Sequence, residues 1–278
     1  MNTETTNPYK NLRKWNGVMA VLHLVQGVIM LLLSKELLTQ ISLWLPNPTV
    51  GGQRNSELVR QDWYSVNLGY TISLFLFISA IAHLITILPG VYEWYISKLK
   101  DKINLIRWFE YAISSSVMVF VIAILNGVRD GMTLFLLVGL NATMNLFGAS
   151  MEMYNSLLRK TKPEGENGIF KPEWSNFIYG CFAGILPWVV MATYFFVSLN
   201  RLGDLQDLPQ RVKDVLNTVK FIFPVLFVFF NLFAINMVLQ YKQVGKWKDY
   251  LFGEKAYIIL SLVAKSFLAW FIFGGTLR

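Results

Sequence analysis

The strongest constraint on this chain is a series of seven apolar segments, each long enough to cross a lipid bilayer. About 20 consecutive apolar residues span the hydrocarbon core as a helix. The segments lie at residues 15–34, 64–90, 104–126, 132–156, 175–199, 217–241 and 256–276. Because lipid offers no hydrogen-bond partners to free backbone groups, each segment is expected to be helical. The sequence therefore predicts an all-α, rhodopsin-like bundle of seven transmembrane helices, with residues 1–278 forming one membrane domain.

The composition supports a multi-pass protein of the cell membrane. Hydrophobic residues make up 54% of the chain and charged residues 15%, whereas soluble domains carry about 25% charged residues. The net charge of +8 does not indicate nucleic acid, since the basic residues fall in short segments between apolar ones. Cys181 is the only cysteine, which excludes an intramolecular disulfide and a four-cysteine metal site. We predict no metal site and no nucleic-acid partner.

The basic residues also predict the orientation of the chain. Segments on the N-terminal side of the membrane carry 15 Lys and Arg residues, and segments on the opposite side carry nine. The excess predicts a cytoplasmic N-terminus and an extracellular C-terminus. The longest connection, residues 35–63, contains Pro46, Pro48 and two consecutive glycines. We expect it to form a turn-rich extracellular cap over one end of the bundle.

Two charged residues, Lys265 and Glu110, are expected to lie well inside membrane segments. Both segments run in the same direction, and at ~1.5 Å per residue the two depths differ by only a few ångströms. A charge buried in a membrane normally has a partner and a function, so Glu110 is the predicted partner of Lys265. A purely structural salt bridge is the alternative. Ser261 and Ser114, each one turn from a member of the pair, favour a functional role.

Histidines at comparable depth indicate a polar cavity on the N-terminal side. His23 and His83 lie in the first two segments, and Gln26 lies on the face of His23. A hydrogen bond between helices is the alternative explanation for either histidine. In the fourth segment, Glu152 lies close enough to the end of the membrane to be solvated. Aromatic and sulfur-containing residues could line an apolar ligand pocket or simply pack the core: Met118, Met144, Trp188, Phe230 and Trp270.

A lysine in an apolar interior has a specific chemistry. A desolvated lysine can form a Schiff base with an aldehyde, and the protonated imine then needs a carboxylate counterion. One lysine, one carboxylate and an aromatic seven-helix interior are the minimum set for a retinal protein. A transporter could also use a single Lys–Glu pair.

Several motifs around these residues match one family. The longest are residues 107–111 (RWFEY), 114–118 (SSSVM), 257–266 (YIILSLVAKS) and 268–270 (LAW). Shorter ones are 22–26 (LHLVQ), 139–142 (GLNA), 184–188 (GILPW) and 239–242 (LQYK). On these motifs the chain resembles the heliorhodopsin family of microbial-type retinal proteins. It departs from the family pattern at Asn236 and Met237, where an apolar residue and a glutamine are expected.

The resemblance implies roles for individual residues. Lys265 would carry all-trans-retinal as a Schiff base, with Glu110 as its counterion. The residues that would tune the Schiff-base surroundings are Ser114, Ser115, Asn141 and Ser261. Those that would contact the polyene are Trp188, Phe230 and Trp270. The family's polar inner cavity would contain His23, Gln26 and His83. The resemblance also implies the orientation given above and a homodimer.

A light sensor with a slow photocycle is the leading functional hypothesis, and the protein is not expected to be an enzyme. Glu110 is the only deep carboxylate, and a proton pump needs one on each side of the Schiff base, so no net pumping is predicted. A cytoplasmic signalling partner would dock on the basic inner loops or on the 35–63 cap. The alternative is a light-gated proton or ion channel, as reported for some family members. A retinal-free secondary transporter is less favoured, because no inverted repeat is evident.

Overall fold

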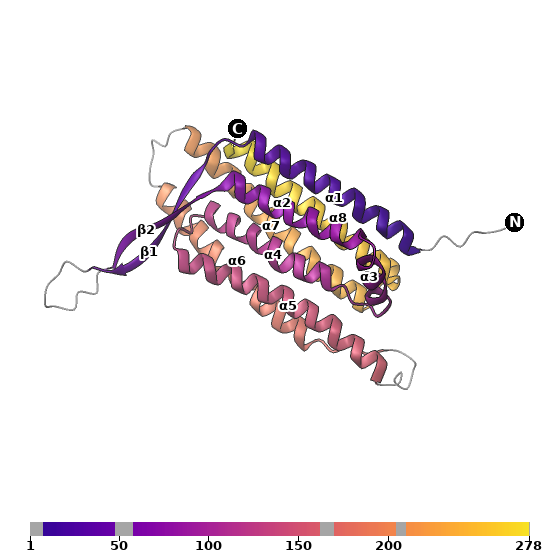
Figure 1. Cartoon of the computed structure of the whole chain (residues 1–278). Coiled ribbons are helices and arrows are strands. Elements are labelled where there is room, and N and C mark those ends of the chain that lie inside the picture. Colours follow the sequence, from indigo (N-terminus) through magenta and orange to yellow (C-terminus); the bar gives the residue numbers. More distant parts are fainter. Residues whose placement is uncertain (1–7, 48–57, 162–169, 204–209, 278) are drawn as a thin grey trace.

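The computed structural model describes residues 8–47, 58–161, 170–203 and 210–277 of the chain. In this part, seven helices are long and apolar enough to cross a membrane, and they pack side by side as a bundle (Figure 1). They are α1 (Pro8–Leu33), α2 (Leu68–Ile87), α4 (Leu105–Leu125), α5 (Gly131–Thr161), α6 (Ser175–Gly203), α7 (Gln210–Tyr241) and α8 (Tyr250–Ile272). The prediction of a mostly helical protein with seven membrane segments is confirmed.

Side-chain caps explain where several helices begin. The Asn67 side chain accepts hydrogen bonds from the amides of Gly69 and Tyr70, so α2 begins at Leu68 rather than at residue 64. Asn104 and Asp249 cap α4 and α8 in the same way. Such caps satisfy backbone N–H groups that have no partner inside the helix.

The connection between α1 and α2 differs from the predicted turn-rich cap. It contains an antiparallel hairpin of β1 (Leu38–Pro46) and β2 (Leu58–Asn67). The hairpin runs across one end of the bundle and extends beyond it (Figure 1), and Ser42 donates its amide to Arg129 O just before α5. Both strands contain β-branched and aromatic residues, which favour strands. The prediction gave more weight to the prolines and glycines of the connection. Residues 48–57 of the predicted cap lie outside the described residues.

The other end of the bundle carries the start of α1, and we call it the N-terminal end. Here the short helix α3 (Val91–Lys100) covers the bundle (Figure 1). Its buried residues Tyr95 and Leu99 pack with Leu12 of α1 and Leu251 of α8. A short turn, η1 (Gly245–Lys248), connects α7 to α8, and a second turn, η2 (Phe273–Leu277), follows α8.

The largest apolar core lies toward the hairpin end. In α8 it contains Leu268 and Ile272, after Lys265, and in α4 it contains residues such as Met118 and Ile122, after Glu110. Phe75 belongs to the same core in α2. Among the described residues, the buried charged groups therefore lie at Lys265 or on its N-terminal side, and the core beyond is mainly apolar.

Candidate functional site

Lys265 and Glu110 form a buried ion pair between α8 and α4. Lys265 Nζ lies 2.7 Å from Glu110 Oε1, and the two residues are only 2% and 9% exposed. Lys265 also donates a hydrogen bond to Ser261 Oγ at 2.8 Å. Four residues turn an α-helix by about 40° beyond a full turn, which places both side chains on one face. The structure thus brings Glu110 and Ser261 to Lys265, as the sequence predicted.

Ser79 of α2 also contacts the ion pair, and this role was not predicted from the sequence. Its hydroxyl donates to Glu110 Oε1 at 2.6 Å, and the residue is fully buried. Ser79 lies one turn before His83, and this spacing could have indicated it. The Tyr111 ring also faces the lysine, with Nζ 5.3 Å from its centroid. Ser114, one turn after Glu110, is fully buried as well.

A cavity of about 570 Å³ extends from Lys265 between α4, α5, α6, α7 and α8. This size falls within the usual range for small-molecule pockets. Lys265 and Ser261 lie at its wall, and the predicted residues Ser115, Met118, Met144, Trp188 and Phe230 line it. The ring centroid of Trp188 lies 5.2 Å from the ring centroids of both Phe227 and Phe230. The cavity is therefore largely apolar and aromatic, with an amine at its wall.

Glycines give the cavity part of its space. A Cβ atom on Gly184 would lie 2.3 Å from Met144 Sδ, and one on Gly148 would lie 2.3 Å from the Trp108 ring. Gly148, Gly184, Met144 and Trp108 all line the cavity. Any larger residue at either glycine would push a lining side chain out of place.

Trp270 does not lie where it was predicted. It is not part of the cavity lining, it is 39% exposed, and its indole Nε1 donates to Gln26 Oε1 at 2.9 Å. The five residues from Lys265 to Trp270 rotate the side chain by about 140° around the helix axis. Trp270 consequently faces away from the cavity and joins α8 to α1.

Asn141 lies behind the cavity wall rather than at Lys265. Its amide donates to Ser115 Oγ at 2.7 Å and to Ser116 Oγ at 3.0 Å. Asn145, one turn later, donates to the same Ser115 hydroxyl at 3.2 Å and lines the cavity. These bonds join α5 to α4 beside the site.

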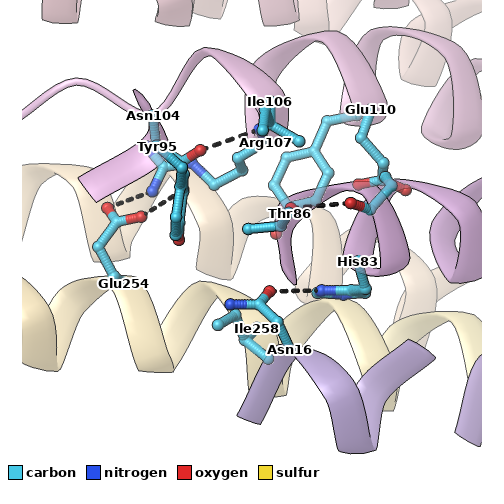
Figure 2. A pocket seen from close by; sticks show the side chains of 12 residues that line it. Asn16, His83, Thr86, Tyr95, Asn104, Ile106, Arg107, Glu110, Glu254 and Ile258 are labelled. Atoms are coloured by element: carbon cyan, nitrogen blue, oxygen red, sulfur yellow. Dashed lines mark hydrogen bonds and ion pairs between the residues drawn. The ribbon is translucent and has the colours of Figure 1, made fainter. Parts of the chain in front are cut away.

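A second, polar cavity lies on the N-terminal side of Glu110 (Figure 2). Its volume of about 40 Å³ is enough for one or two water molecules. His83 lines it, and His83 Nδ1 lies 2.8 Å from Asn16 Oδ1. His23 stacks on His83 with ring centroids 5.7 Å apart. Gln26 instead accepts a hydrogen bond from Trp270. Of the three residues predicted for the polar cavity, His23 and His83 lie together and Gln26 lies apart.

At the far side of this polar cavity, Arg107 binds two buried carboxylates. Its two terminal nitrogens donate to Glu152 of α5 and Glu254 of α8, and its guanidinium lies 3.9 Å from the centroid of the Tyr257 ring. Figure 2 shows Arg107 and Glu254 on the opposite side of the cavity from Glu110. Glu152 and Glu254 are each 1% exposed, so the prediction that Glu152 is solvated was wrong. Tyr95 and Leu99 of α3 help to close this end of the bundle.

Asn236 and Met237, the two residues that depart from the family pattern, each have a structural role. Met237 lines the large cavity. Asn236 is buried and turns the other way, accepting a hydrogen bond from Trp247 Nε1 at 2.6 Å. The first residue therefore fixes the α7–α8 connection, and the second shapes the cavity.

The geometry of the large cavity and of the Lys265–Glu110 pair fits retinal, the cofactor that the sequence resemblance implied. An apolar, aromatic cavity of suitable volume holds the amine of Lys265 at its wall, and a carboxylate lies within hydrogen-bond distance of that amine. Among curated proteins, none matches the sequence. The family model for heliorhodopsin matches residues 12–277, nearly the whole chain. The chain therefore belongs to the heliorhodopsin family, the retinal-binding photoreceptors of the membrane.

Proposed function

We propose that this heliorhodopsin is a light sensor with a slow photocycle and no net ion transport, carrying all-trans-retinal on Lys265. The observation that carries the proposal is the position of Lys265. Its amine lies at the wall of the aromatic cavity and 2.7 Å from the Glu110 carboxylate. Retinal, bound to this amine as a protonated Schiff base, supplies visible absorption and photoisomerisation.

The residues around Lys265 would hold a positive charge on its nitrogen. Glu110 provides the opposite charge, and in a low-dielectric interior this attraction is strong. Ser79 orients the carboxylate by donating to Oε1, and Ser261 accepts from the lysine nitrogen. Trp188, Phe227 and Phe230 form an apolar wall that excludes water. Motion of the lysine nitrogen would weaken the pair and release a bond that joins α4 to α8.

The distribution of carboxylates supports the absence of pumping. Among the side chains that the structure describes, the buried carboxylates are Glu110, Glu152 and Glu254. Glu152 and Glu254 lie on the N-terminal side of Glu110, and the space toward the hairpin end is filled by apolar residues such as Met118 and Leu268. A pump would need proton-accepting groups on both sides of the lysine nitrogen.

The orientation and the partners belong to the same proposal. The excess of basic residues on the N-terminal side supports a cytoplasmic N-terminus. The N-terminal end would then present its loops to a cytoplasmic signalling partner. We also propose a homodimer, as the family resemblance implies.

Two experiments test the proposed function. All-trans-retinal added to the purified protein should produce a visible absorption band, and Lys265→Ala should not produce it. A band that survives in the variant would overturn the attachment site. Voltage-clamped cells expressing the protein should show no sustained photocurrent. A photocurrent that reverses with the proton gradient would favour the light-gated channel instead.

A further inference from the structure

The N-terminal end of the bundle carries a surface on which basic residues outnumber acidic ones. Six lysines are exposed there, and none of them is ion-paired within the described part of the chain: Lys14, Lys100, Lys171, Lys242, Lys246 and Lys248. Four acids lie at the same end, and each has a partner other than these lysines. Glu93, Glu173 and Asp249 accept hydrogen bonds from the backbone amides of Gly90, Ser175 and Leu251. Asp101 pairs with Lys160 at 2.6 Å.

Three of the six lysines lie on the short connection between α7 and α8, residues 242–249, which we call the lysine loop. Its backbone is well defined. Gln243 and Gly245 adopt φ angles of 52° and 54°, and the Val244 amide donates to Leu239 O at 3.1 Å. These bonds end α7 and reverse the chain. The three ammonium groups are thus attached to a structured turn.

Besides its backbone bonds to α7, the lysine loop is connected to the cavity-lining part of α7 by a side-chain hydrogen bond. Trp247 Nε1 donates to Asn236 Oδ1 at 2.6 Å, and Asn236 Nδ2 donates to Gly253 O at 3.2 Å. On the same helix, Phe233 and Met237 line the cavity, one turn before and one residue after Asn236. The loop is therefore in direct contact with the part of α7 that forms the cavity wall.

Exposed tryptophans place this end of the bundle at the headgroup layer of a membrane. Trp15 of α1 is 37% exposed and Trp94 of α3 is 42% exposed. Tryptophan is enriched at membrane–water interfaces, where its ring meets the headgroups. Lysines at this depth attract anionic lipid. The two features together favour a lipid over a protein as the occupant of the basic surface.

We propose that the lysine loop binds the headgroups of anionic phospholipids, and that the Trp247–Asn236 hydrogen bond couples this binding to the large cavity. Each lysine ammonium offers a compact charge to a phosphate oxygen. The lipid site does not depend on the proposed light-sensing function. A role of lipid binding in modulating a light signal does rest on that function, so both tests use retinal-free protein.

The lipid site is tested by comparing two triple variants with the same change in charge. The first removes Lys242, Lys246 and Lys248 as glutamines, and the control replaces Lys35, Lys213 and Lys220, which are exposed toward the hairpin end. Native mass spectrometry counts phosphatidylglycerol bound in competition with phosphatidylcholine. At about 1 kcal/mol per lysine, the first variant should bind phosphatidylglycerol about 100-fold more weakly than wild type, and the control should bind it as wild type does. Equal binding by the two variants, or no preference for phosphatidylglycerol in wild type, would overturn the site and leave an acidic protein as the occupant.

The coupling is tested through Cys181, the only cysteine of the chain, which lines the cavity. An environment-sensitive fluorophore on Cys181 should change its emission when phosphatidylglycerol is added. Trp247→Phe keeps an aromatic ring at this position and the three lysines but removes the indole N–H donor. It should keep lipid binding and lose the emission change. An equal emission change in wild type and variant would refute the coupling, whatever the protein does with retinal.

Discussion

Ser79 and Lys265 donate hydrogen bonds to the same atom, Oε1 of Glu110. The two donors lie 2.6 Å and 2.7 Å from that oxygen. They come from α2 and α8, and the acceptor belongs to α4, so three helices meet at one carboxylate oxygen. The position of the negative charge beside the lysine is therefore fixed from two sides.

Replacing this carboxylate should move the visible band to longer wavelength. In Glu110→Gln the retinal-bound protein loses the negative charge that stabilises the cation in its ground state. Ser79→Ala removes one hydrogen bond to a charged group, a contribution of about 1.5–3 kcal/mol, and should give a smaller shift. Absorption spectra of the two variants measure both effects. Asp130→Asn, just before α5, is the control with no shift. An unchanged spectrum in Glu110→Gln would reject this residue as the counterion.

The space next to Met144 should limit retinal binding. In Gly184→Ala the new Cβ would lie 2.3 Å from Met144 Sδ, so the methionine side chain must move. We expect retinal to bind about tenfold more weakly, which corresponds to about 1.4 kcal/mol. Titration with retinal measures the affinity.

Two further variants test this explanation. Gly139→Ala is the matched control, because a Cβ at Gly139 meets nothing within 4 Å. The double variant Gly184→Ala, Met144→Ala should recover part of the affinity. Equal losses in Gly184→Ala and Gly139→Ala would show that crowding at Met144 is not the cause.

Removing Arg107 should destabilise the protein severely. Arg107→Gln leaves Glu152 and Glu254 buried without their cation, and breaking a buried pair costs about 3–5 kcal/mol. Lys160→Gln breaks the pair with Asp101, in which the lysine side chain is 57% exposed, and should cost no more than about 1 kcal/mol. Thermal unfolding in detergent compares the two. Similar melting temperatures would mean that the Arg107 cluster contributes little to stability.

The two tryptophans predicted to contact retinal should behave differently. Trp188 is 6% exposed and lines the cavity, whereas Trp270 is 39% exposed and binds Gln26. Trp188→Phe should shift the visible band, because it changes a wall of the cavity. Trp270→Phe should leave the band in place. A shift in Trp270→Phe alone would contradict the placement described above.

The lysine and its carboxylate could be predicted from the sequence because a charge in an apolar segment has few explanations. Ser261 followed from its four-residue spacing to Lys265. Trp270 was misplaced because its type suggests a ligand pocket, while its direction depends on an angle of about 140° around the helix. Residue type and helical angle must be read together at such positions.

Arg107 and Glu152 could not be recognised in the same way. Both lie near the ends of apolar segments, where charged residues are common and usually solvated. Their burial depends on tertiary contacts: α3 covers this end of the bundle, and Glu254 approaches from α8, 147 residues along the chain from Arg107. The hairpin escaped prediction for another reason, since Pro46, Pro48 and the two glycines at 51 and 52 were taken to indicate turns.

The ion pair of Lys265 and Glu110 also has a consequence for how the protein matures. An ammonium group has no lone pair, so Lys265 must lose a proton before its nitrogen can attack the carbonyl carbon of an incoming aldehyde. The nearest acceptor is Oε1 of Glu110, at 2.7 Å. The carboxylate would thus act first as a general base during cofactor loading, and only afterwards as the negative charge beside the finished pigment. In Glu110→Gln the amine loses both this base and the charge that stabilises its protonated form, so the speed of assembly and the colour of the pigment depend on the same oxygen.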